Sequence, residues 1–149
     1  MKKITIVMLV CLVALCSYGQ QALELKIKKQ SDLPNTATEH LYLIEIVNHS
    51  NSSEEFTIVT NDKNCNNIEQ SKQVVLKRQV LNSQKIKGFK SGTIKANSTI
   101  DFYIKISRND DTPLGKWNCT EIKVLSSNDD NISNTLVIKS QIPDPKNFN

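Results

Sequence analysis

Apolar and polar residues alternate along much of this chain, and the clearest run lies between residues 100 and 106. The apolar side chains occupy every second position of that run, at Ile100, Phe102, Ile104 and Ile106. A period of two places one row of side chains in a core and the other row in solvent, so the run predicts a half-buried antiparallel strand. The Pro113-Leu114-Gly115 sequence that follows predicts a turn into a further strand.

Similar apolar runs recur along the chain, and polar, asparagine-rich turns separate them. The expected strands cover residues 23–28, 41–47 and 55–60, one or two short strands within 74–81, a strand pair within 93–106, and residues 117–125 and 133–140. No segment shows a sustained helical period. We therefore expect an all-β chain, with one immunoglobulin-like antiparallel β-sandwich domain over residues 20–149 and about seven to eight strands.

Residues 1–19 have the features of a cleaved signal peptide. A basic start and an apolar run, Lys2 to Leu15, precede Ser17-Tyr18-Gly19, whose small residues fit a cleavage site. The run is shorter than the about 20 residues that a membrane-spanning helix needs, which disfavours an uncleaved anchor. Lipid attachment at Cys16 is disfavoured because a leucine precedes it. We expect a mature chain that starts at Gln20, has no transmembrane segment, and is periplasmic, cell-surface or extracellular.

The charge of the chain does not predict a nucleic-acid partner. The sequence carries 19 basic and 15 acidic side chains, and most lysines alternate with apolar residues in the expected strands. The densest basic cluster lacks the interleaved aromatic residues that stack on bases, and it consists of Lys85, Lys87, Lys90 and Lys95. We interpret this cluster as a solvated face and expect no nucleic-acid binding.

Two cysteines, Cys65 and Cys119, lie outside the expected signal peptide. Exported compartments are oxidising, so one disulfide is the simplest interpretation. Closing so long a loop would stabilise the fold by about 4 kcal/mol in the chain-entropy model. Two free thiols or a metal site are the alternatives. The chain has only two histidines, His40 and His49, and no Cys-x-x-Cys motif, so we expect no metal and no cofactor.

The candidate catalytic residues do not form a recognisable set. Neither histidine has a nucleophile, a base and an orienting group nearby in the sequence. Paired carboxylates occur in the expected loops, at Glu54-Glu55, Asp110-Asp111 and Asp129-Asp130. Such loop pairs can bind calcium, but they lack a repeated Asp-x-Asp-Gly pattern and are interpreted as solvated loop residues. We expect no catalytic activity.

Sandwich modules often bind glycans on exposed aromatic rings. Phe56 and Phe102 fit core positions, and Trp117 fits a corner of the sandwich. Tyr103 lies on the outward row of its strand, and Phe89 lies in a loop. Tyr103 and Phe89 are therefore the candidate ligand-facing aromatics.

Residues 93–138 carry a resemblance to a known family. A small-residue bend at Ala96-Asn97-Ser98 leads into the alternating strand, the Thr112–Trp117 turn and a further alternating strand up to Val124. This order resembles the bacterial immunoglobulin-like modules known as the NPCBM-associated domain of alpha-galactosidases and the CARDB-type domains. Those modules usually have Pro-Gly-Glu at the bend and a tyrosine at the position of Trp117. Leu41–Asn48 resembles the first hairpin of the family, including the asparagine that closes the strand.

The resemblance also bears on the cysteines. In immunoglobulin-like folds an aromatic residue near the start of strand F precedes a cysteine by two residues, as Trp117 precedes Cys119. Cys65 would then lie at the end of strand C, which neighbours strand F in the sheet. The resemblance thus implies that a Cys65–Cys119 disulfide is geometrically reasonable.

These observations lead to two functional hypotheses. The first is an exported immunoglobulin-like binding or structural module of the cell envelope, without catalytic activity, whose partner is an envelope protein or a glycan. The alternative is a carbohydrate-binding accessory module that works with a separately encoded glycosidase. The alternative predicts that Tyr103, Phe89 and another ring gather on one exposed face.

Overall fold

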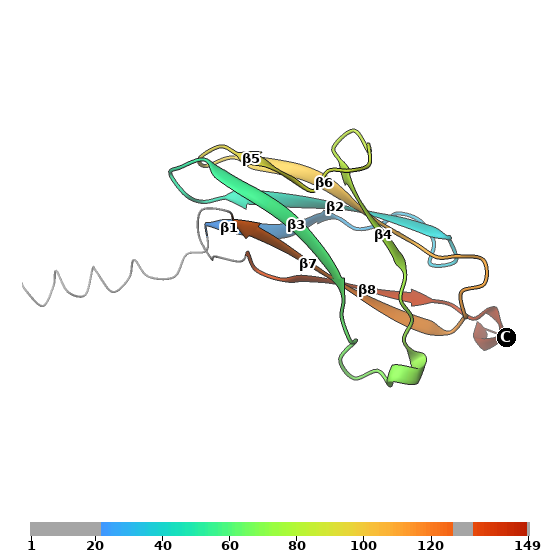
Figure 1. The fold of residues 1–149 in the computed structure, drawn as a ribbon. Helices are drawn as coiled ribbons and strands as arrows, with labels where there is room; N and C mark the ends of the chain where they lie inside the picture. Colours follow the sequence, from blue (N-terminus) through green and yellow to red (C-terminus); the bar gives the residue numbers. More distant parts are fainter. Residues whose placement is uncertain (1–21, 127–132, 149) are drawn as a thin grey trace, which may run out of the picture.

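Residues 22–126 and 133–148 are described by a computed structural model. They form two four-stranded sheets that pack face to face (Figure 1). The first sheet has the strand order β1-β2-β6-β4, the second has the order β5-β3-β7-β8, and all neighbouring strands are antiparallel. The predicted all-β antiparallel sandwich is confirmed for this part of the chain.

The strands of the first sheet are β1 (Leu23–Lys29), β2 (Glu39–Asn48), β6 (Thr99–Ser107) and β4 (Lys77–Asn82). Those of the second sheet are β5 (Ser91–Ile94), β3 (Glu54–Asp62), β7 (Lys116–Ser126) and β8 (Leu136–Ile142). Two short 3-10 helices, η1 (Gln70–Lys72) and η2 (Pro145–Phe148), lie in connections. The described residues contain no helix long and apolar enough to cross a membrane. The expected signal peptide, residues 1–19, lies outside the described ranges.

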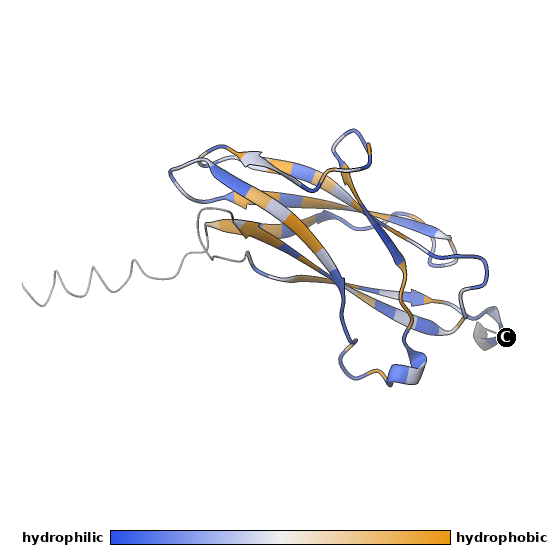
Figure 2. Cartoon of the chain, viewed as in Figure 1, coloured by the Kyte–Doolittle hydropathy of each residue, from blue (hydrophilic) through white to orange (hydrophobic). Residues whose placement is uncertain are grey.

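The core lies between the two sheets and contains the alternating row that the sequence predicted. Phe102, Ile104 and Ile106 of β6 are each at most 1% exposed, whereas Ile100 at the start of the strand is half-buried. The opposite sheet contributes a matching row of buried side chains: Phe56, Ile58, Ile122, Val124 and Ile138. Figure 2 shows the resulting alternation of apolar and polar positions along β3. Burying each such side chain stabilises the fold by about 1.5–3 kcal/mol.

The bend at Ala96-Asn97-Ser98 connects the two sheets. The sequence predicted a strand pair on either side of this bend, and that detail is wrong, because β5 pairs with β3 and β6 pairs with β2 and β4. Asn97 adopts a φ of 50°, in the left-handed region that asparagine tolerates. Its backbone N–H donates to the carbonyl of Ser50, 3.1 Å away, which joins the bend to the β2–β3 turn.

A cross-link joins the end of β3 to β7. Asp62 is the last β3 residue paired with β7, opposite Thr120, and the Cys65–Cys119 disulfide follows with a Cα–Cα distance of 5.4 Å. The predicted cysteine pairing is therefore present in the structure. Residues 74–76, which the sequence placed in a strand, instead cross from the second sheet to the first and lead into β4 (Figure 1).

Candidate functional site

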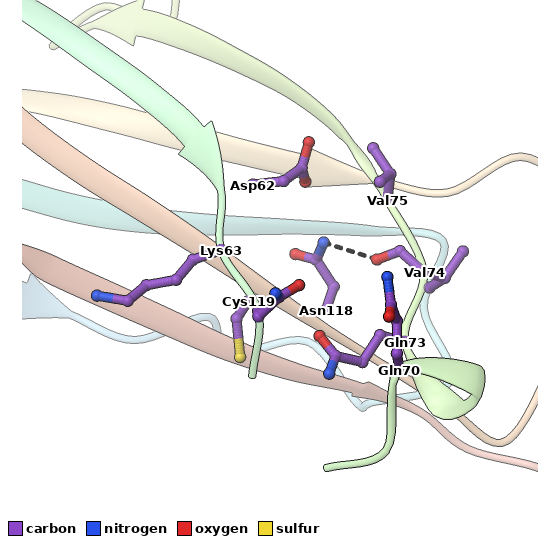
Figure 3. Close-up of a pocket in the computed structure, with 9 residues that line it drawn as sticks. Asp62, Lys63, Gln70, Gln73, Val74, Val75, Asn118 and Cys119 are labelled. Carbon is purple, nitrogen blue, oxygen red and sulfur yellow. Dashed lines mark hydrogen bonds between the residues drawn. The ribbon is translucent and has the colours of Figure 1, made fainter. Parts of the chain in front are cut away.

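A polar groove of about 310 Å³ lies at the end of the sandwich where β3 stops (Figure 3). One wall is the chain that leaves β3, and the other wall is the chain that approaches β4. Asn118 and Cys119 of β7 lie between the two walls. We call this feature the end groove.

The end groove exists because two segments share one edge of β7. Beyond Asp62, the N–H of Lys63 donates to the carbonyl of Cys119 at 2.9 Å. The chain then leaves β7 and returns in the parallel direction, where the N–H of Val74 donates to the carbonyl of Trp117 at 2.8 Å. Neither segment pairs continuously with β7 at this point, so a hollow remains between them.

Asn118 anchors the wall formed by the chain that approaches β4. Its side chain is 2% exposed, and its Nδ2 donates to the carbonyl of Val74 at 2.9 Å (Figure 3). Its Oδ1 accepts a hydrogen bond from the hydroxyl of Thr120, also at 2.9 Å. A buried amide with both partners satisfied holds its neighbours in one arrangement.

Gln73 fixes the loop between the walls. Its Oε1 accepts a hydrogen bond from the N–H of Cys65 at 2.8 Å, and its Nε2 donates to the carbonyl of Ile68 at 2.8 Å. The same loop is tied to β7 by the disulfide. The groove therefore has walls that are held by a covalent bond and by side-chain hydrogen bonds.

Other lining groups are available to a ligand. The side chains of Asn64 and Gln70 are exposed and make no hydrogen bond with any described residue, and Val75 is 69% exposed. By contrast, Asp62 forms an ion pair with Arg78. The side chain of Lys63 points away from the groove in Figure 3, and its Nζ lies 3.1 Å from Glu121. Two amides, which both donate and accept, and an apolar side chain suit an uncharged hydrogen-bonding ligand such as a peptide backbone.

The two histidines lie apart and serve local structure. The Nδ1 of His40 is 3.1 Å from the hydroxyl of Ser31, and burial lowers the pKa of His40. His40 borders a hollow of only about 20 Å³, with Leu76 and Arg108. His49 lies near the other end of β2, where its Nε2 is 2.7 Å from Glu24, and this hydrogen bond lowers the pKa of Glu24.

The candidate carboxylates are also separate from the end groove. Glu54 is buried, and its oxygens accept hydrogen bonds from the hydroxyls of Ser50, Ser52 and Ser126. Glu55 and the Asp110-Asp111 pair are exposed. Asp129-Asp130 lies outside the described residues. Within the described ranges, no three His, Cys, Asp or Glu side chains are grouped so that they could hold a metal ion.

The two candidate ligand-facing rings do not share a surface. Phe89 is half-buried, and its ring centroid lies 6.0 Å from that of Phe56 and 6.3 Å from that of Phe102, so it packs against the core. Tyr103 follows Phe102 in β6 and points to the opposite face, where the Nζ of Lys85 lies 5.4 Å from its ring. Phe89 lies in a loop as expected, but its half-buried ring packs against core residues instead of facing solvent.

Apart from Cys119, the sequence analysis did not single out the residues of the end groove. Asn118 could have been noticed, because it interrupts the inward row of β7 that continues with Thr120, Ile122 and Val124. Gln73, Gln70 and Asn64 have no such signal, because they lie in a polar connection where any of the neighbouring amides would fit the same pattern.

Comparisons with known proteins support the fold and leave the family open. No protein-family model and no curated protein sequence matches this chain. A FixG-related protein from Vibrio parahaemolyticus is similar in structure, with a TM-score of 0.54 and 7% identity over 83% of this chain and 98% of that one. A PapD-like domain of human CEP192 has a TM-score of 0.43 and 8% identity over 83% and 87% of the two chains.

A family 123 glycoside hydrolase from Clostridium perfringens also matches, with a TM-score of 0.50 and 12% identity over 81% of this chain. The match spans 27% of the hydrolase chain. At such low sequence identities, these structural similarities define the fold alone. The chain is an immunoglobulin-like β-sandwich. An immunoglobulin-like module, the coarser part of the predicted resemblance, is consistent with these likenesses, whereas the NPCBM-associated and CARDB-type families are not matched.

Proposed function

We propose that the chain is an exported binding module that holds a partner at the end groove and catalyses no reaction. The observation that supports this proposal is that the walls of the groove are held in place while several lining side chains remain available to a ligand. The walls are held by the disulfide, Asn118 and Gln73. The exposed side chains of Asn64, Gln70 and Val75 line the groove and are available to a ligand. A site that is already ordered before binding loses little conformational entropy when a ligand occupies it.

Export is part of the proposal. A disulfide that joins the connection after β3 to β7 is typical of oxidising compartments outside the cytoplasm. The signal peptide at residues 1–19 and a mature domain from Gln20 complete this part. The module would then act in the periplasm, on the cell surface or outside the cell.

The proposed partner is a segment of an envelope protein. The end groove is lined by amides, valines, a disulfide cysteine and two ion-paired charged residues, and no described aromatic residue lines it. The carbohydrate-binding alternative depends on rings gathered on one face, and Phe89 and Tyr103 lie on opposite faces of the first sheet. A peptide therefore fits the described surface better than a glycan.

Backbone amide NMR spectra of the purified protein would test this function. Peptides derived from envelope proteins and a panel of oligosaccharides would be titrated in parallel. We expect peptides to shift the signals of Asn64, Gln70 and Val75. Gln70→Ala should weaken that binding by about fivefold to tenfold, because one hydrogen bond is lost. Asn66→Ala, an exposed position in the same loop outside the groove, is the matched control and should have no effect.

Two results would contradict the proposal. Oligosaccharides that shift signals around Tyr103, with no peptide binding, would favour the accessory module. An absence of binding by every member of both panels would argue against a binding role for the end groove.

A further inference from the structure

We propose that the free edge of β4 accepts an extended, acidic segment of a partner protein as an added strand. This inference rests on the proposed binding function and names the chemistry of its partner. β4 begins two residues after Val75, which lines the end groove, so the two surfaces are continuous along the chain.

The two edge strands of the first sheet differ in how they are covered. β1 is an edge strand of the first sheet, and the side chain of Asn134 covers it. The N–H of Leu25 donates to Oδ1 of Asn134 at 2.6 Å, and Nδ2 of Asn134 donates to the carbonyl of Leu25 at 2.9 Å. These are the two bonds that a neighbouring strand would make. β4 is the other edge of this sheet, and no side chain of the described residues covers its backbone in this way.

The backbone of β4 presents donors and an acceptor along this edge. The N–H of Asn82 donates to the carbonyl of Ile86 at 2.9 Å, so it points away from β6. Because backbone groups alternate in direction along a strand, the N–H of Val80 and the N–H and carbonyl of Arg78 also point away from β6. The bridge between Leu81 and Lys87 closes the edge beyond Val80. An unpaired edge of this kind can pair with an extended peptide.

The charge around this edge is positive and uncompensated. Several lysines elsewhere in the protein form ion pairs with acidic side chains, including Lys28, Lys63 and Lys105. The lysines in β4 and in the turn after it form no ion pair with any described residue, and all are exposed: Lys77, Lys85 and Lys87. A partner with alternating acidic side chains would supply the missing charges, which favours both encounter and a defined register.

Apolar side chains lie at both ends of the same edge. Val75 is 69% exposed before β4, and Ile86 is 62% exposed in the turn after it. The open edge between residues 76 and 80 spans roughly 13 Å, enough for a short added strand. An extended peptide whose backbone pairs with the open edge would cover Val75, whereas Ile86 lies beyond the Leu81–Lys87 bridge. Nucleic acid would leave the backbone groups of β4 unpaired, so the geometry favours a peptide.

The test uses the purified protein and a short peptide in which glutamate and valine alternate. We expect binding, and we expect the outward-facing amides of Arg78 and Val80 to exchange more slowly with the peptide present than in the free protein. A version of the peptide that is N-methylated at every amide keeps its charge and loses its backbone donors, and it should bind at least about tenfold more weakly. A peptide with lysine in place of glutamate should not bind.

Variants of the protein give an independent measurement. Lys77→Glu combined with Lys87→Glu should weaken binding of the glutamate peptide by at least about tenfold. Lys146→Glu reverses an exposed lysine near the C-terminal end and should leave binding unchanged. Thermal unfolding would verify that both variants are folded.

Each outcome has a defined meaning. Equal binding of the N-methylated peptide, slowed exchange away from β4, or equal binding of a single-stranded oligonucleotide would overturn strand addition. If the glutamate peptide does not bind while other peptides still shift signals of the end groove, strand addition fails and the binding module remains. If no peptide of either experiment binds, both proposals fail.

Discussion

Asn118 is a polar residue on the inward row of β7, and its amide is the floor of the end groove. Both of its polar atoms are bonded, to Val74 and to Thr120. Removing a buried amide leaves its former partners without hydrogen bonds, which costs more than the bond itself contributes.

Asn118→Ala should therefore lower the free energy of unfolding by about 1–3 kcal/mol. It should also speed hydrogen exchange at Val74, whose segment loses its anchor. Urea unfolding and exchange NMR would measure the two effects. Asn64→Ala, in the opposite wall, is the control for an exposed asparagine and should change stability by less than about 0.5 kcal/mol. An equal loss in both variants would contradict the anchoring role.

His40 gives the fold a dependence on pH. Burial lowers its pKa from the ordinary value of 6.5, so the folded protein prefers the neutral ring. As pH falls below about 6.5, the unfolded chain binds a proton more readily than the folded chain, and stability falls.

The variant His40→Gln should remove this part of the pH dependence, because glutamine keeps a polar group near Ser31 and does not titrate. Unfolding free energies measured between pH 7.5 and 5 would show a smaller slope than in the wild-type protein. The lowered pKa values of Glu24 and Glu121 act in a separate window, below about 4.5, where stability is lost in both proteins. A slope identical to wild type would show that His40 does not cause it.

At the scale of elements, two connections add contacts that hold the sandwich together. The β4–β5 connection inserts Phe89 against Phe56 and Phe102, where it covers the side of the core. The β3–β4 connection is tied to β7 by the disulfide, and the side chain of Gln73 bonds Cys65 and Ile68 within the connection.

Phe89→Ala should destabilise the protein by about 2 kcal/mol, which is below the range for a fully buried phenylalanine because the ring is half-buried. Tyr103→Ala removes a ring from the outward face of the same sheet and should cost less. Thermal and denaturant unfolding of the two variants would compare them directly. If the tyrosine variant loses more stability, the placement of the two rings is wrong.

The double variant Cys65→Ser, Cys119→Ser should lose up to about 4 kcal/mol of stability in the chain-entropy model, since the cysteines are separated by 54 positions. Gln73 should keep part of the loop in place, so the sandwich should remain folded while exchange between Lys63 and Gln73 becomes faster. Circular dichroism and hydrogen exchange would measure both. A wild-type exchange pattern would mean that hydrogen bonds alone hold the loop.

Strand positions followed from periodicity, and connections did not. The β6 row from Phe102 to Ile106 was predicted because alternation is a property of the local sequence. The partners of β5 and the path of residues 74–76 were predicted incorrectly or not at all. Those features depend on which distant edge offers unpaired backbone groups, and a local pattern contains no information about that.

At the scale of the whole molecule, the proposed export can be measured by intact mass. Mass spectrometry of protein recovered from producing cells should give a chain that starts at Gln20 and is lighter by two hydrogens than the dithiol, because of the Cys65–Cys119 bond. Reduction should restore the two hydrogens. A chain that retains residues 1–19, or one with two free thiols, would contradict this part of the proposal.

The sequence by itself determined that this chain forms strands with one apolar face, and hence two sheets packed on a shared core. It also indicated the pairing of Cys65 with Cys119. Only the tertiary structure decided that Phe89 faces the core, that Asn118 and Gln73 order the end groove, and that β4 keeps an uncovered edge. The physical reason is that burial depends on a repeating local pattern, whereas grooves and edges depend on where segments distant in sequence stop pairing.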